Sequence, residues 1–153
     1  MVNLQIGALL QLTKELLPAM LQKQHGGILN VASVYAFSPV VFQAVYGACK
    51  SFLYSFSAAL AHEVADYGVA VTVLCPGVTR TEFRSRAGVK AKKPGAGMSA
   101  EAVADYGFNA LMRGRLLAVP GMLNKLFVLA ARHLPAGAIT TLLRGINRIR
   151  GLG

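Results

Sequence analysis

Cysteine, histidine and acidic residues are scarce in this chain of 153 residues, and each scarcity excludes a class of protein. The two cysteines, Cys49 and Cys75, lie within an expected helix and an expected strand. They are predicted to be small buried apolar residues of a cytoplasmic protein, which excludes a disulfide framework. The three histidines have no ligand partner at metal-binding spacing, so no metal site is predicted at His25, His62 or His133.

Long apolar runs are also absent, although 54% of the residues are hydrophobic and only 14% are charged. The most apolar tract, residues 116–131, is interrupted by Pro120, Gly121, Asn124 and Lys125. A helix that crosses a bilayer needs about 20 consecutive apolar residues. The sequence therefore predicts a single packed core rather than a membrane span or two domains.

Acidic residues are rarest relative to basic ones in the second half of the chain. Residues 1–79 hold three basic and three acidic side chains, whereas residues 80–153 hold thirteen Lys or Arg against three acids and carry the whole net charge of +10. Such an excess is typical of proteins that contact phosphorylated ligands, nucleic acid or membrane surfaces. We expect no nucleic-acid partner. Peripheral contact with a membrane remains an alternative to a purely cytoplasmic location.

The segment 135–150 is predicted to be a basic amphipathic helix. Its apolar residues recur at helical spacing and its arginines Arg144, Arg148 and Arg150 fall on other faces. Two interpretations remain open for this segment. It is either a terminal helix docked on the body with a solvated basic face, or a helix that lies on a membrane surface.

Ser33, Tyr46 and Lys50 have the types and spacing expected of a proton-transfer site. Tyr46 and Lys50 are four residues apart in an expected helix, so their side chains share one face. A nearby ammonium stabilises phenolate and is expected to lower the tyrosine's pKa from about 10. Ser33, at the end of an apolar run, can donate a hydrogen bond to a carbonyl oxygen beside that phenol. The trio could move a proton on or off an alcohol oxygen.

The tyrosine–lysine pair alone is weak evidence for catalysis. The same spacing also occurs where a tyrosine is simply buried in the core and the aliphatic part of a lysine packs beside it. Two further features support the catalytic interpretation. Ser33 lies thirteen residues before Tyr46, and Pro76-Gly77-Val78-Thr79-Arg80-Thr81 follows the next apolar strand. In these motifs, their order and their spacing, the chain resembles the short-chain dehydrogenase/reductase family. The resemblance is nearly gapless over residues 30–83 and extends more loosely over most of the chain.

This resemblance implies roles for individual residues. Tyr46 would be the general acid, Ser33 would steady the carbonyl oxygen, and Lys50 would lower the tyrosine's pKa and hold the nicotinamide ribose. Asn3, within Val2-Asn3-Leu4, matches an asparagine that holds a proton-relay water at a kinked helix start. The implied cofactor is NAD or NADP and the implied substrate is a small-molecule carbonyl or alcohol. The expected cofactor-binding residues are Tyr46, Lys50, Pro76, Gly77, Val78 and Thr81.

A complete member of that family begins with a strand, a Gly-rich turn and a helix that bind the pyrophosphate. None of the sixteen glycines here forms such a turn. We therefore expect residues 1–153 to be a single partial domain, the carboxyl-terminal part of an enzyme that is inactive alone. Within it, residues 28–83 would form the catalytic core and residues 84–98 the substrate loop.

The same sequence is compatible with a second kind of protein. A catalytically dead remnant could act as an interaction module, because the expected helices 4–23 and 43–67 resemble those through which family members form homo-oligomers. The third interpretation is a binder of membrane surfaces that uses the basic half of the chain.

The predicted fold class is α/β, part of a doubly wound, Rossmann-like parallel sheet whose amino-terminal strands are missing. Helices are expected at 4–23, ended by His25-Gly26-Gly27, at 43–67, at 99–113 and in two later segments. Strands are expected at 28–33, 69–75 and 116–119. Alternation of helices and strands predicts a parallel sheet with right-handed crossovers.

Overall fold

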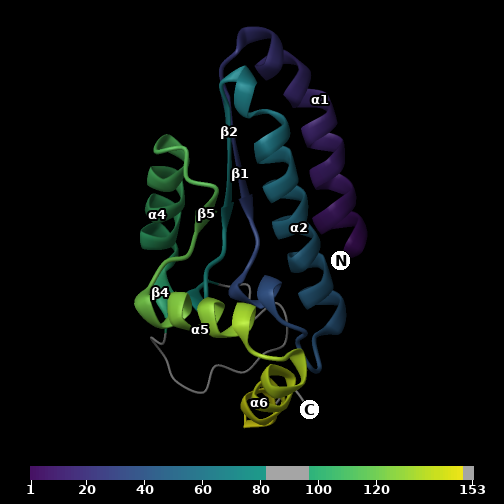
Figure 1. Cartoon of the computed structure of the whole chain (residues 1–153), viewed down its shortest axis with the longest axis vertical. Helices are drawn as coiled ribbons and strands as arrows, with labels where there is room; N and C mark the ends of the chain where they lie inside the picture. The colour runs from purple at the N-terminus through teal and green to yellow at the C-terminus, as the bar shows by residue number, and fades with distance from the viewer. Residues whose placement is uncertain (82–96, 150–153) are drawn as a thin grey trace.

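The computed structural model describes residues 1–81 and 97–149, and a parallel sheet lies at their centre (Figure 1). Its strands are β1 (Gly26–Val31), β2 (Val69–Leu74) and β5 (Leu117–Ala118), in the order β1-β2-β5. The central strand, β2, is almost fully buried, as expected of a strand covered on both faces. The predicted parallel α/β fold is confirmed.

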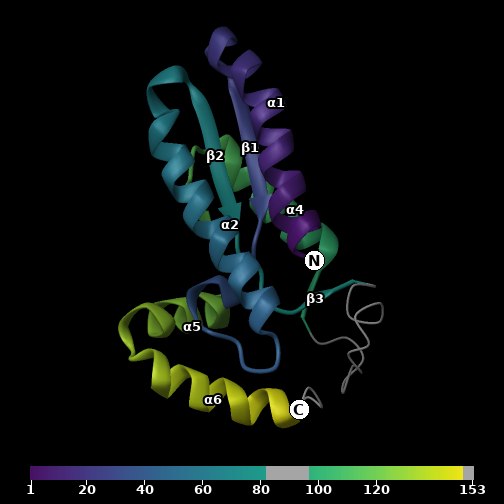
Figure 2. The same cartoon turned by 90° about the vertical axis from the view of Figure 1, so that its right-hand side faces the viewer.

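Helices cover both faces of this sheet, as Figures 1 and 2 show. The helices α1 (Ala8–Lys23) and α2 (Ala44–Glu63) lie on one face, and α4 (Ala100–Met112) lies on the other. Ser99 caps α4, because its hydroxyl oxygen accepts a hydrogen bond from the Ala102 N–H at 3.2 Å. The shorter elements are η1 (Asn3–Gly7), η2 (Val34–Phe37), η3 (Ala65–Tyr67), β3 (Thr79–Arg80) and β4 (Met98–Ser99).

Two further helices, α5 (Met122–His133) and α6 (Ala136–Ile149), lie at the end of the molecule beyond the carboxyl ends of β1 and β2 (Figures 1 and 2). Ile139 and Leu143 on α6 are only 4% and 2% exposed, whereas Arg144 and Arg148 are exposed. Of the two interpretations of this segment, the docked terminal helix describes α6. The side chain of Ile149 and all of Arg150 lie outside the described residues.

The first strand differs from its prediction at both ends. The strand expected at 28–33 begins at Gly26 and ends at Val31, so Ser33 follows it rather than ending it. The preceding helix ends at Lys23, as predicted, and Gln24 caps it in a left-handed conformation with φ of 48°. Gly26 and Gly27, which were expected to end the helix, belong to the strand. Gly26 is needed there because a Cβ atom would lie 2.7 Å from the Met20 side chain.

The second long helix, unlike the first, ends earlier than predicted. It stops at Glu63, and the turn η3 follows before Gly68 reverses the chain with φ of 67°. This turn starts β2 directly beside β1, with Gly26 paired to Val69 and Val31 to Leu74. Among the described residues β2 is the only strand that pairs with β1, so β1 forms one edge of the sheet.

The described residues provide neither a membrane-spanning helix nor a cluster of metal ligands. No helix within residues 1–81 and 97–149 is long and apolar enough to cross a membrane. The same residues contain no group of three or more His, Cys, Asp or Glu side chains that could hold a metal ion.

Candidate active site

Ser33 and Tyr46 meet at the carboxyl edge of the sheet. Ser33 follows β1 and caps η2, its hydroxyl oxygen accepting a hydrogen bond from the Tyr35 N–H at 3.2 Å. Tyr46 lies in the first turn of α2, and a side-chain hydrogen bond joins it to Ser33. Since the Tyr35 N–H occupies a lone pair of the serine oxygen, the serine hydroxyl is left to donate.

Lys50 lies one helical turn beyond Tyr46 and is fixed by the backbone of β1. Its Nζ donates a hydrogen bond to the Val31 carbonyl oxygen at 2.9 Å and lies 5.6 Å from the centroid of the Tyr46 ring. This bond uses one of the three N–H donors of the ammonium. The charge is therefore held beside the phenol at the end of the strand.

The expected lowering of the Tyr46 pKa is wrong for this chain. Burial raises the pKa of Tyr46 above its ordinary value of 10.0, while the hydrogen bond with Ser33 lowers it and neighbouring Tyr35 raises it. Burial likewise lowers the pKa of Lys50, against the opposing influence of Cys49 and Cys75. Removal from water disfavours the charged form of both groups and outweighs their interactions. Tyr46 is therefore protonated near neutral pH, the form that can donate a proton.

The Pro-Gly turn lies beside this trio. The Pro76 carbonyl oxygen accepts a hydrogen bond from the Val34 N–H at 3.1 Å, which ties the turn after β2 to the segment after β1. Val78 is 38% exposed and Thr81 is also exposed. Most of the predicted substrate loop, 84–98, lies outside the described residues, which resume at Gly97.

Gly77 is closely covered by α5. A Cβ atom on Gly77 would lie 2.2 Å from the Asn124 Oδ1, so any side chain there would require the Asn124 side chain to move. The Asn124 side chain is held in place, since its Nδ2 donates a hydrogen bond to the Pro120 carbonyl oxygen at 2.6 Å. Helix α5 therefore packs against the turn that is expected to bind the cofactor.

Asn3 begins a stretch of π-helix rather than a regular α-helix. Its carbonyl oxygen accepts a hydrogen bond from the Ala8 N–H, five residues along the chain. Such a widened turn is a local distortion of the kind often found at functional sites. Its side chain is exposed, and η1 packs against α2, the helix that carries Tyr46.

The structure adds aromatic and basic side chains that motif spacing did not identify. The ring of Tyr35 makes edge contacts with Tyr46 and with Phe127 of α5, each with centroids 6.5 Å apart. Arg132 of α5 donates a hydrogen bond to the Tyr54 hydroxyl at 2.5 Å and lies 5.5 Å from the Phe37 ring. No sequence signal marks Phe127 or Arg132, because their partners are distant in the chain.

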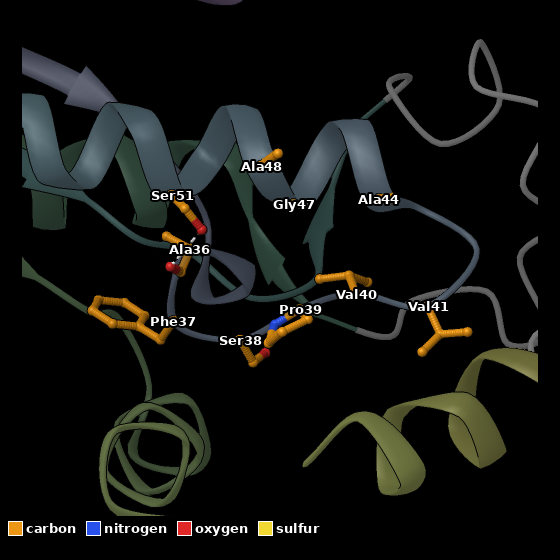
Figure 3. Close-up of a pocket in the computed structure, with 10 residues that line it drawn as sticks. All are labelled: Ala36, Phe37, Ser38, Pro39, Val40, Val41, Ala44, Gly47, Ala48 and Ser51. Carbon is orange, nitrogen blue, oxygen red and sulfur yellow. Dashed lines mark hydrogen bonds between the residues drawn. The ribbon is translucent and has the colours of Figure 1, made fainter. Parts of the chain in front are cut away.

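A pocket of about 620 Å³ lies on another face of α2, between that helix and the segment 36–41 (Figure 3). Ser51 closes one side by donating a hydrogen bond to the Ala36 carbonyl oxygen at 2.8 Å. With 3.6 residues per turn, Gly47 and Ser51 project from a different face than Tyr46 and Lys50. This pocket contains none of the trio and is not the candidate active site.

We expect the Cys75 thiol to resist alkylation in the folded protein. Burial raises the pKa of Cys75 to about 12, against smaller lowering effects of Ser33, Lys50 and Arg132, and the residue is 0% exposed. In a Cys49→Ala variant, iodoacetamide at pH 9 should modify Cys75 only after denaturant is added, as mass spectrometry would show. Equal rates with and without denaturant would contradict this burial.

The same group contributes to the pH dependence of stability. Between pH 9 and about pH 12 the unfolded thiol loses its proton while the folded thiol keeps it, so stability should fall as pH rises through this window.

Known proteins resemble this chain in sequence and structure. Residues 1–92 match the profile of the short chain dehydrogenase family. The chain is 42% identical over 83 residues to serine 3-dehydrogenase of Agrobacterium fabrum, covering 54% of this chain and 33% of that protein. It is 35% identical over 85 residues to carbonyl reductase family member 4 of Xenopus laevis, covering 56% and 36% respectively. The chain thus spans about a third of these curated relatives.

A solved structure with the same fold is a short-chain dehydrogenase from Sphingobium yanoikuyae in complex with NADPH. Its TM-score to this chain is 0.73 at 28% sequence identity, over 96% of this chain and 53% of that one. The family profile covers more than half of the residues here. The chain therefore belongs to the short chain dehydrogenase family.

Proposed function

We propose that this chain is the catalytic and nicotinamide-side segment of an NAD(P)-dependent oxidoreductase that interconverts a carbonyl and an alcohol. The observation that carries the proposal is the hydrogen bond between Ser33 and Tyr46, with Lys50 held one helical turn away. The names of the relatives, a carbonyl reductase family member and a serine dehydrogenase, support this class of reaction.

In the proposed mechanism Tyr46 gives its proton to the carbonyl oxygen during reduction. The Ser33 hydroxyl donates a hydrogen bond to the same oxygen and stabilises the negative charge that develops there. When bound, a nicotinamide cofactor would supply the hydride for the carbonyl carbon. Hydride and proton together convert the carbonyl to an alcohol, and alcohol oxidation requires Tyr46 to accept the proton instead. The raised pKa of Tyr46 keeps its hydroxyl protonated near neutral pH, which is the form that reduction requires.

The residues present fit the nicotinamide half of a dinucleotide. Lys50 would hold the ribose hydroxyls with its remaining N–H donors, and the exposed turn at Val78, with Pro76, Gly77 and Thr81, would face the nicotinamide. Helix α5 packs against this turn, since the Asn124 side chain lies next to Gly77. Asn3 would hold a proton-relay water, a role that the widened turn of η1 supports. Nothing in the sequence distinguishes NAD from NADP.

The 153-residue chain on its own should bind NAD and NADP only weakly. A Gly-rich turn at a helix start normally provides the N–H groups that bind the pyrophosphate, and the sequence contains none. Isothermal titration calorimetry of each dinucleotide should therefore give dissociation constants well above the micromolar range. Micromolar binding by this chain would refute the expectation and indicate a different cofactor site.

The proposal includes a homo-oligomer formed through α1 and α2. Large apolar residues remain exposed on the outer sides of both helices, including Leu12 and Leu16 at 57% and 55% and Phe52 at 36%. Contiguous apolar surface of this kind is typical of protein interfaces. One of these two helices, α2, lies within the proposed catalytic core, residues 28–83.

A further inference from the structure

Helix α5 is apolar on two opposite faces, which is unusual for a helix at the end of a molecule. Its inner face holds Val128, 5% exposed within the main core cluster, and Phe127, which contacts Tyr35. Its outer face holds Met122, Leu126 and Leu129, spaced as neighbours along one side of a helix. A helix docked on a core normally presents polar side chains to water on its outer face.

The outer side chains are strongly exposed. Met122 is 69% exposed, Leu126 54% and Leu129 55%, and the adjacent Leu123 is 83% exposed. We call these four residues the outer face of α5. Single exposed leucines are common on protein surfaces, but a contiguous group of them marks a surface that contacts a protein or a membrane.

The charge around the outer face of α5 identifies the partner. From residue 106 to the end, the chain has seven Lys or Arg and no Asp or Glu. Lys125 lies beside the outer face on α5 itself, and Arg144 and Arg148 are exposed on the adjacent helix α6. An apolar stripe with Lys125 beside it and basic residues on the next helix complements a bilayer that contains anionic lipids, whereas a second copy of this region would bring like charges together.

We propose that the outer face of α5 docks on the surface of a membrane that contains anionic phospholipids. The four apolar side chains enter the boundary between headgroups and acyl chains, and Lys125, Arg144 and Arg148 contact lipid phosphates. This assignment differs from insertion of α6 itself, because Ile139 and Leu143 of α6 are already buried against the protein.

Docking at this face would connect the membrane to the candidate active site. On its inner side α5 places Asn124 against Gly77 and Phe127 against Tyr35, which contacts Tyr46. The docked face and the candidate site therefore share one helix. Vesicle binding can be measured without any catalytic activity, so the docking proposal and the proposed function can fail separately.

Flotation of the full chain with lipid vesicles tests the proposal. Vesicles of phosphatidylcholine alone are compared with vesicles in which about a third of the lipid is phosphatidylglycerol, at low and high salt. We expect at least about tenfold more protein with the anionic vesicles at low salt, and a loss of most of this excess at high salt. Absence of flotation, or equal flotation with both lipids, would overturn the proposal.

Two matched double variants locate the docking face. Leu126→Gln with Leu129→Gln should reduce flotation about tenfold, because each loses apolar side-chain burial in the membrane. Phe108→Gln with Met112→Gln on α4, where the exposures are 57% and 68%, should float like the unmodified chain. Circular dichroism and protection of Cys75 from alkylation establish that each variant is folded.

The remaining outcomes are equally decisive. Unchanged flotation of the α5 variant, or equal loss in the α4 variant, would show that the outer face of α5 is not the docking surface. If the α5 variant instead abolished self-association of a chain that does not bind vesicles, the partner would be a second copy and the membrane proposal would be wrong.

Discussion

Tyr46→Phe should lower carbonyl reduction by about 10²–10⁴-fold, the typical contribution of a positioned general acid. The measurement requires a protein in which this chain follows the amino-terminal dinucleotide-binding half of a relative, assayed by NAD(P)H oxidation with a panel of carbonyl compounds. Cofactor binding should change little, because the phenylalanine keeps the ring and removes only the hydroxyl that bonds to Ser33. The expected loss therefore falls on the rate rather than on the affinity for the dinucleotide.

Two further variants separate catalysis from structure. Lys50→Met should weaken both the rate and cofactor binding, because the ammonium lies beside the Tyr46 ring and is proposed to hold the ribose. Tyr54→Phe is a matched control on the same helix, since its hydroxyl bonds to Arg132 rather than to the candidate site. If Tyr46→Phe retained more than about a tenth of the rate, Tyr46 would not be the general acid.

Gly68→Ala should destabilise the folded chain by about 3 kcal/mol, measured as the change in the free energy of urea unfolding. Roughly 1–2 kcal/mol would come from placing an L-residue at a φ of 67°. A further contribution, typically about 1–3 kcal/mol for an overpacked site, would come from the new Cβ atom, which would lie 2.4 Å from the Gln24 carbonyl oxygen. This contact is with backbone and cannot be relieved by a side-chain rotation.

Gly114 provides the control for that substitution. Its φ of 61° is nearly the same, yet a Cβ atom there would meet nothing within 4 Å. Gly114→Ala should therefore show only the conformational cost, roughly 1–2 kcal/mol. Equal destabilisation by the two substitutions would mean that the turn at Gly68 relaxes away from Gln24.

Elements with a local signal were predicted well. The start of α4 at Ser99 follows from a capping side chain and an acidic first turn, and β2 follows from a run of β-branched residues. Boundaries that depend on contacts between elements were predicted less well. The strand β1 begins at Gly26 rather than at residue 28, because Gly26 passes close to Met20, a contact that the local sequence does not reveal.

The pKa of Tyr46 shows the same limit at the candidate site. Helical spacing correctly placed Lys50 one turn from Tyr46, and from this proximity alone a lowered pKa was expected. Burial acts in the opposite direction and dominates, and the amount of burial depends on Tyr35 and on the packing around the ring. The sequence shows which residues lie next to Tyr46 on its own helix. It does not show how far other elements of the fold bury the Tyr46 side chain.

The sequence by itself determined the family, the parallel α/β fold and the three residues of the candidate site, because each of these depends on spacing along the chain. Only the tertiary structure decided that Ser33 bonds to Tyr46, that Asn124 closes over Gly77, and that α5 exposes a second apolar face. The physical reason is that these features join segments distant in the chain. Their contacts depend on how helices pack at the carboxyl edge of the sheet, which local periodicity does not encode.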